Sequence, residues 1–189
     1  LCLPGSRRGE VTRLLPRFGE ALTILRDREP GLRVVIPTVR GVAPLVRDIA
    51  RRWPSAPLVV EDADDKRAAF AAADLALAAS GTVSLDLAAN RVPMVIGYDM
   101  NWLSRLLIGR MLKVDTVTLV NLVSETRVVP ELIGPDCRAP ALARQAHGRC
   151  ARACCGRRDD CRAGERIGRR PLRRGCRPGS RRRDPSSGN

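Results

Sequence analysis

The segment Ser80-Gly81-Thr82 lies between an apolar run and a stretch with helical spacing. A turn of small residues at a helix start leaves backbone N–H groups without partners, and together with the helix dipole these groups favour an anion such as a phosphate. Asp86 follows about one helical turn later, where a carboxylate can accept hydrogen bonds from ribose hydroxyls, as acidic residues do in nucleotide-binding α/β folds. The segment therefore predicts a nucleotide-phosphate site.

A second turn of this kind opens the chain, where Gly5, Ser6 and Arg7 follow a short apolar run. Two such loops on one sheet predict a site for a nucleotide or a nucleotide sugar, with Arg7 placed to pair with phosphate. A simpler alternative fits each loop alone, because Ser and Thr cap helices whatever the function. In that alternative Arg7 is a solvated side chain and Asp86 only complements the dipole of its helix.

Strand-like and helix-like segments alternate along residues 1–137. Short apolar or β-branched runs predict strands, and apolar spacing near 3.6 predicts helices. The expected strands are 1–3, 32–36, 58–60, 75–79, 93–96 and 116–119, and the expected helices are 10–28, 42–53, 65–73, 83–90 and 102–112. Pro16 is expected to break or restart the first helix. The alternation predicts an α/β fold with a Rossmann-like parallel sheet, helices on both faces and the ligand at the carboxyl ends of the strands.

Composition divides the chain into a domain over 1–137 and a basic tail over 138–189. The tail holds 16 arginines and four acidic residues, which is +12 of the net charge of +14, and five of the seven cysteines. It is so poor in large apolar residues that we expect it to be disordered. The domain has two cysteines and no signal peptide, which fits a reducing compartment. Because the chain begins at Leu1, within an expected strand, we expect a portion to be missing before it.

The tail has three competing interpretations. A zinc site would use His147, Cys150, Cys154, Cys155 and Cys161, but their spacing lacks paired C-x2-C motifs. A basic nucleic-acid-binding protein would act through residues 138–189, although the arginines have no interleaved aromatic residues and no lysine. The third interpretation is a frameshift product, because Arg, Gly, Pro, Ala and Cys dominate when GC-rich DNA is read out of frame. We favour the frameshift.

Four ordered motifs closely resemble those of the lipid-A-disaccharide synthases. They are Pro4-Gly5-Ser6-Arg7, Ala79-Ser80-Gly81-Thr82, Pro93-Met94-Val95-Ile96-Gly97-Tyr98 and Val120-Asn121-Leu122. The match covers about residues 1–137 and looks like the C-terminal, donor-binding half of a GT-B glycosyltransferase, a fold of two Rossmann-like domains. The resemblance implies an inverting hexosyltransferase. Such an enzyme transfers 2,3-diacylglucosamine from its UDP carrier to 2,3-diacylglucosamine 1-phosphate, with a β-1,6 linkage, in lipid A biosynthesis.

The resemblance also implies roles for individual residues. The UDP-binding residues would be Gly5, Ser6, Arg7, Ser80, Gly81, Thr82, Asp86 and Asn121, and the sugar side would include Tyr98 and Asn101. The family more usually has Glu where this chain has Asp86, and because Asp is shorter by one methylene group, the ribose contact is left open as either direct or bridged by a water. Arg7 and the two helix starts would stabilise the leaving diphosphate. No metal and no cofactor are expected, and the general base is expected in the missing N-terminal half.

The resemblance implies a location at the cytoplasmic face of the inner membrane of a Gram-negative bacterium, in peripheral contact with that membrane. It is also compatible with a homodimer. The UDP-sugar donor and the acylated sugar phosphate are the expected partners, and no nucleic acid is expected. The nearest rivals are another UDP-sugar glycosyltransferase and a UDP-sugar 2-epimerase of similar fold. Each of them would bind UDP but act on a different sugar. The chain alone is expected to bind donor weakly and to catalyse little.

Overall fold

A computed structural model describes residues 1–54, 56–99 and 116–149 of the chain. Strands and helices alternate over most of this length. They are β1 (Cys2–Leu3), α1 (Arg8–Arg28), β2 (Val35–Pro37), α2 (Ala43–Ala50), β3 (Leu58–Val60), α3 (Ala63–Ala72), β4 (Ala76–Ala79), α4 (Val83–Ala89), β5 (Met94–Tyr98), α6 (Leu119–Val123) and β6 (Glu131–Ile133). A single 3-10 turn over Gly134–Asp136 and a helix over 139–149 follow.

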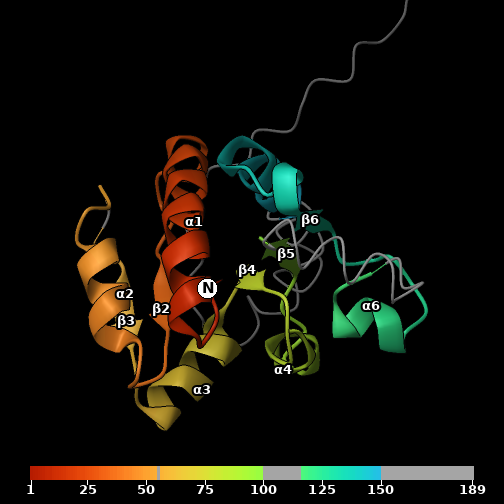
Figure 1. The fold of residues 1–189 in the computed structure, drawn as a ribbon, viewed down its shortest axis with the longest axis horizontal. Coiled ribbons are helices and arrows are strands. Elements are labelled where there is room, and N and C mark those ends of the chain that lie inside the picture. The colour runs from red at the N-terminus through yellow and green to blue at the C-terminus, as the bar shows by residue number, and fades with distance from the viewer. Residues whose placement is uncertain (55, 100–115, 150–189) are drawn as a thin grey trace, which may run out of the picture.

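The strands form a parallel sheet, which confirms the expected α/β class. Four strands are hydrogen-bonded in the order β1-β4-β5-β6, and β2 pairs with β3. Because β2 also lies beside β1, the order across the domain is β3-β2-β1-β4-β5-β6 (Figure 1). This is the Rossmann order, in which the direction of winding reverses between β1 and β4. The carboxyl ends of those two strands lie at this reversal.

Helices cover both faces of the sheet. Successive side chains of a strand point to opposite faces, and here the set of side chains on each face is apolar. One set, which includes Leu77 and Val95, packs against α1, α2 and the helix over 139–149. The other set, which includes Ala78 and Ile96, packs against α3, α4 and α6. Strands that are buried on both faces read as continuous apolar runs, as the sequence of β4 and β5 does.

Helix α1 is continuous through Pro16, so the expected break there is wrong. A proline inside a helix removes one backbone hydrogen bond and costs roughly 3 kcal/mol. The apolar face of α1 offsets this cost, because full burial of each large side chain contributes about 1.5–3 kcal/mol. That face buries Val11, Leu14, Leu15, Phe18, Leu22 and Leu25. Tertiary packing therefore decides the conformation at Pro16.

The last strand lies later in the chain than the sequence predicts. Residues 116–118 form no strand, Leu119–Val123 form α6, and the sheet is instead extended by β6. The N–H groups of Val117 and Thr118 donate to the Glu131 carboxylate. Because a side chain takes these donors, they are not available to a strand ladder.

The packed domain also extends beyond the expected boundary at residue 137. Leu142, Ala143 and Ala146 are buried in the helix over 139–149, in the same core as α1. The small alanine side chains allow this helix to pack closely although it has few large apolar residues, so the expected disorder of 138–149 is wrong. Residues 100–115 and 150–189 lie outside the described residues, and with them the expected helix 102–112, Asn101 and the cysteines from Cys150 onward.

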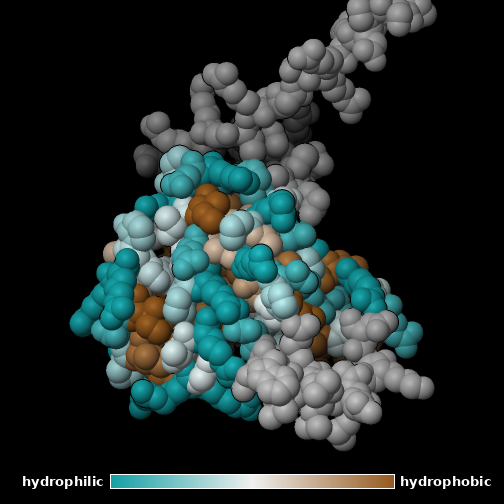
Figure 2. All heavy atoms as spheres, turned by 45° about the horizontal axis from the view of Figure 1, so that its top comes forward, coloured by the Kyte–Doolittle hydropathy of each residue, from teal (hydrophilic) through white to brown (hydrophobic). Residues whose placement is uncertain are grey.

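Hydrophilic side chains cover most of the described surface on the face drawn in Figure 2, where apolar residues form separate patches. Within the described ranges, no helix combines the length and the apolar character needed to cross a bilayer.

Candidate functional site

The two glycine-containing loops lie side by side at the reversal in the sheet. Leu3 pairs with Ala78 in the parallel ladder between β1 and β4. The loop after β1 carries Gly5, and the loop after β4 carries Gly81, so both leave the same edge of the sheet next to each other. In doubly wound sheets, ligands bind in the crevice outside the carboxyl ends of the strands at this position.

The first loop is organised by Glu10, a residue to which the sequence analysis gave no role. Its carboxylate accepts hydrogen bonds from the N–H groups of Ser6 and Arg7, at 3.2 and 3.3 Å. Gly5 has a φ of +105°, and a Cβ at this position would lie 2.3 Å from Glu10 Oε2. Only glycine therefore combines this backbone conformation with the close approach of the Glu10 side chain.

Arg7 is the cation at the mouth of this loop. Its Nη1 lies 3.1 Å from Glu10 Oε1, and 84% of the Arg7 side chain is exposed. An ion pair that is open to water contributes only about 0–1 kcal/mol. The guanidinium is therefore held near the loop and can still turn toward an anion at small cost.

The second loop is open to an incoming group. Gly81 has a φ of +149°, and a Cβ built there would meet no atom of the described residues within 4 Å. Ser84 Oγ donates to the Gly81 carbonyl at 2.8 Å, and Thr82 is exposed at the start of α4. The N–H groups of Ser84 and Leu85 donate to the carbonyl oxygens of Gly81 and Thr82, at 3.2 and 2.9 Å. An anion at this edge would therefore meet the N–H groups of Thr82 and Val83, which precede them.

The remaining sequence-predicted residues lie in different surroundings. Asp86 is exposed on α4, one turn beyond the loop. Tyr98 ends β5 and is half-buried, and Asn101 lies outside the described residues. Asn121 is buried, and its amide exchanges hydrogen bonds of 2.8 and 3.0 Å with the backbone of Val129. The amide of Asn121 therefore holds the chain between α6 and β6 together.

Glu131 is a second carboxylate that the sequence analysis missed. It accepts hydrogen bonds from the N–H groups of Val117 and Thr118, from Asn121 Nδ2 at 3.0 Å and from the Thr116 hydroxyl. Burial raises the pKa of Glu131, but these hydrogen bonds outweigh burial and hold it below the ordinary value. The only sequence signal was a charged residue beside the β-branched run before Pro130, which gives no partner.

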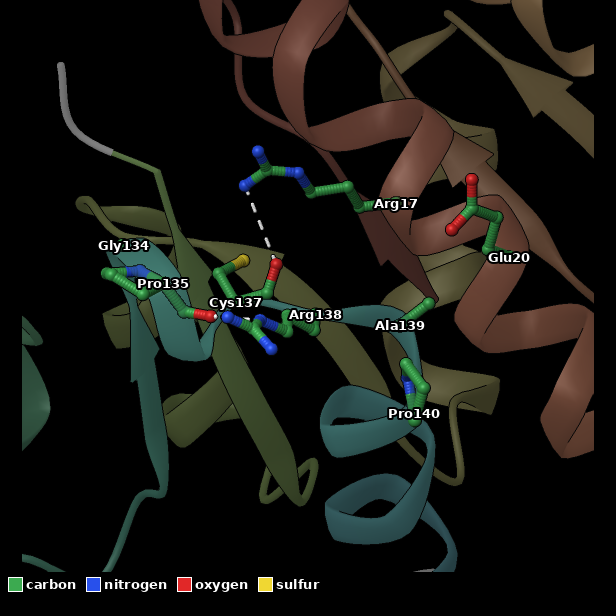
Figure 3. A pocket seen from close by; sticks show the side chains of 8 residues that line it. All are labelled: Arg17, Glu20, Gly134, Pro135, Cys137, Arg138, Ala139 and Pro140. Atoms are coloured by element: carbon green, nitrogen blue, oxygen red, sulfur yellow. Dashed lines mark hydrogen bonds between the residues drawn. The ribbon is translucent and has the colours of Figure 1, made fainter.

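A pocket of about 290 Å³ lies apart from the two loops, between α1 and residues 134–140 (Figure 3). Arg17 of α1 points into it toward the Cys137 carbonyl, at 3.5 Å, and also pairs with Asp99 at 3.0 Å. Burial raises the pKa of the Cys137 thiol, which is therefore neutral. The pocket contains none of the sequence-predicted site residues, and Arg17 ties α1 to the segment that follows Tyr98.

The described part of the chain places no three His, Cys, Asp or Glu side chains where they could hold a metal ion together. His147 lies instead 3.6 Å from Glu29, at the end of α1. The other members of the expected zinc site lie outside the described residues.

Comparison with known proteins identifies the family. The sequence model of the family described as lipid-A-disaccharide synthetase matches residues 1–153. The chain is 57% identical over 151 residues to the lipid-A-disaccharide synthase of Ruegeria pomeroyi, and the alignment covers 76% of this chain and 38% of that protein. It is 50% identical over 141 residues to the lipid-A-disaccharide synthase of Rhodospirillum centenum, and this alignment covers 75% of this chain and 35% of that protein. It is 44% identical over 143 residues to the lipid-A-disaccharide synthase of Gluconobacter oxydans, and this alignment covers 76% of this chain and 34% of that protein.

The chain thus spans 34–38% of the length of these three relatives. The matched range runs past residue 149, so the helix over 139–149 belongs to the family's sequence as well as to the packed domain. The four motifs, the Rossmann strand order and the family match agree, and the chain belongs to the lipid-A-disaccharide synthase family.

Proposed function

We propose that this chain is the donor-binding part of a lipid-A-disaccharide synthase. The complete enzyme would transfer 2,3-diacylglucosamine from UDP-2,3-diacylglucosamine to 2,3-diacylglucosamine 1-phosphate, with a β-1,6 linkage and inversion at the anomeric carbon. The observation that carries the proposal is the pairing of β1 with β4, which brings the Gly5–Arg7 and Ser80–Thr82 loops together at the reversal of the sheet. Membership of the family supports the identity of the donor.

The diphosphate of UDP would lie between the two loops. The N–H groups of Thr82 and Val83 and the Arg7 guanidinium would pair with its oxygens. Asp86 would accept a hydrogen bond from a ribose hydroxyl directly or through water. Cleavage of the bond between the sugar and UDP leaves negative charge on the diphosphate. The helix start and Arg7 would stabilise that charge in the transition state, which is an electrostatic role.

The acceptor hydroxyl must lose a proton as it attacks the anomeric carbon. We assign this general base to the part of the relatives' length that the chain does not cover. We also propose that the complete enzyme works at the cytoplasmic face of the inner membrane, in peripheral contact with it, because both sugar substrates carry acyl chains. A homodimer is compatible with this arrangement.

Calorimetric titration of the chain with UDP, uridine and inorganic pyrophosphate tests the proposal. We expect UDP to bind more tightly than either of the other two, because only UDP uses both the phosphate loops and the ribose contact. A panel of UDP-sugars then separates the rivals. Tightest binding of UDP-2,3-diacylglucosamine supports the synthase, whereas preference for a non-acylated UDP-sugar or epimerisation of it would favour another transferase or a 2-epimerase. A chain that binds none of these ligands would contradict the proposal.

A further inference from the structure

The Ser80 hydroxyl is committed to a distant part of the chain. Ser80 Oγ donates a hydrogen bond of 2.6 Å to the carbonyl oxygen of Val117, 37 residues later. Ser80 directly precedes Gly81, so this contact fixes the backbone from which the second phosphate loop starts. The orientation of the loop therefore depends on where residues 116–118 lie.

Residues 116–118 are themselves held by Glu131. Both oxygens of its carboxylate are used: Oε2 accepts the N–H of Val117 at 3.1 Å, and Oε1 accepts the N–H of Thr118 at 3.0 Å. The hydroxyl of Thr116 also donates to Oε1. The backbone of Val117 is thus hydrogen-bonded at both of its polar groups: its N–H donates to Glu131, and its carbonyl oxygen accepts from Ser80.

The position of Glu131 in the sheet does not by itself call for a carboxylate. Glu131 pairs with Ile96 at the start of β6, where a β-branched residue would suit the ladder better. A half-buried carboxylate is costly unless its oxygens are hydrogen-bonded. Here Asn121, which is buried, adds a further donor at 3.0 Å and at the same time clamps the backbone of Val129. These contacts direct the carboxylate toward 116–118.

We propose that Glu131 is a positioning residue for the Ser80–Thr82 loop, acting through residues 116–118. This inference rests on the proposed function, since it assigns a role within the same donor site. Glu131 would not touch the nucleotide. It would keep the Val117 carbonyl where Ser80 can reach it, and so hold the Ser80–Thr82 loop in the position in which it would meet the diphosphate.

A double-mutant cycle on UDP affinity tests the proposal, with Glu131→Gln, Ser80→Ala and the double variant compared with the wild-type chain. Each single variant is expected to weaken UDP binding about three- to tenfold, the size typical of indirect coupling to a site. Because Glu131 would act on the loop through Ser80, the second substitution should add nothing to the first. The double variant should therefore bind UDP no more weakly than the single variant that has the lower UDP affinity. Glu125→Gln is the matched control, because Glu125 is exposed in the same segment, and it should leave UDP affinity unchanged.

Three outcomes would overturn the proposal. Unchanged UDP affinity of Glu131→Gln alongside a lowered Tm would show a purely structural role. Multiplying effects in the double variant would show that Ser80 and Glu131 act independently. Wild-type protein that does not bind UDP would overturn the proposed function itself, and this positioning role with it. If Glu131→Gln does not fold, Thr116→Val removes one donor to the carboxylate and is used in the same cycle, with the same expected non-additivity.

Discussion

The Arg7 guanidinium and the Glu10 carboxylate form an exposed pair at the Gly5–Arg7 loop, with Nη1 and Oε1 3.1 Å apart. The same carboxylate accepts the N–H groups of Ser6 and Arg7. Glu10 therefore shapes the loop from inside, and the cation stays at its mouth, open to water. A diphosphate carries more charge than one carboxylate and can draw Arg7 away from this weak pair.

Arg7→Ala should weaken UDP binding by about 1.5–3 kcal/mol, the range for a hydrogen bond to a charged group. Titration calorimetry measures this directly. Arg28→Ala is the control, because it removes the same charge from the opposite end of α1. Equal affinities of the Arg7 and wild-type proteins would remove Arg7 from the site.

Asp86→Ala should weaken UDP binding about tenfold and leave pyrophosphate binding unchanged, because only UDP carries the ribose that Asp86 would contact. Asp48→Ala, on the exposed surface of α2, is the charge-matched control. Parallel titrations with the two ligands make the comparison. A similar loss for both ligands would mean that Asp86 supports the shape of the phosphate site and has no ribose contact, because removing a negative charge cannot by itself weaken the binding of an anion.

Glu131→Gln should lower the free energy of unfolding by about 1–3 kcal/mol at neutral pH, since it removes a hydrogen-bonded charge. The folded-state pKa of Glu131 is below its ordinary value. Its contribution is therefore fully present above the unfolded-state pKa of about 4.3 and is lost as the pH falls through the lower folded-state value.

Urea unfolding at pH 7, 5 and 3 measures this dependence. The difference between the wild-type and Glu131→Gln proteins should stay constant from pH 7 to 5 and shrink at pH 3. A difference that grows toward low pH would contradict the lowered pKa.

Gly97→Ala should destabilise the domain by about 1–3 kcal/mol, because overpacking forces side chains out of their rotamers. A Cβ at this position would lie 2.7 Å from Phe18 Cε1 and 3.2 Å from Cys137 Sγ. Gly9→Ala is the matched substitution, since its nearest contact is Arg13 Nη2 at an ordinary 3.5 Å. It should be neutral or stabilise α1 by up to about 1 kcal/mol. Thermal unfolding that shows equal losses for both variants would contradict this packing.

Truncation after residue 137 should destabilise the domain by at least about 2 kcal/mol, because it removes the buried Leu142 with its helix. Truncation after residue 149 should leave Tm within a few degrees of the full chain. Differential scanning calorimetry of both truncated proteins measures their Tm values and decides where the domain ends. Resequencing of the source DNA beyond the codon for residue 149 checks the frameshift hypothesis, which stays a prediction.

The sequence by itself determined the features that depend on neighbouring residues. Apolar runs and helical spacing predicted β1 to β5 and α1 to α4 to within a few residues, because burial imposes the periods of strand and helix directly on the sequence. The order of elements and the two glycine loops predicted the Rossmann-like class, and the motifs indicated the family.

Only the tertiary structure decided what depends on residues far apart. Pro16 remains helical because its helix packs along the sheet, and residues 139–149 are ordered because Leu142 reaches the core. Glu131 meets Val117 across 14 residues, and Ser80 meets it across 37. A polar side chain shows in sequence that it can donate or accept, but its partner is set by the folded chain. The hydrogen bonds that join Glu131, Val117 and Ser80 could therefore be found only in the structure.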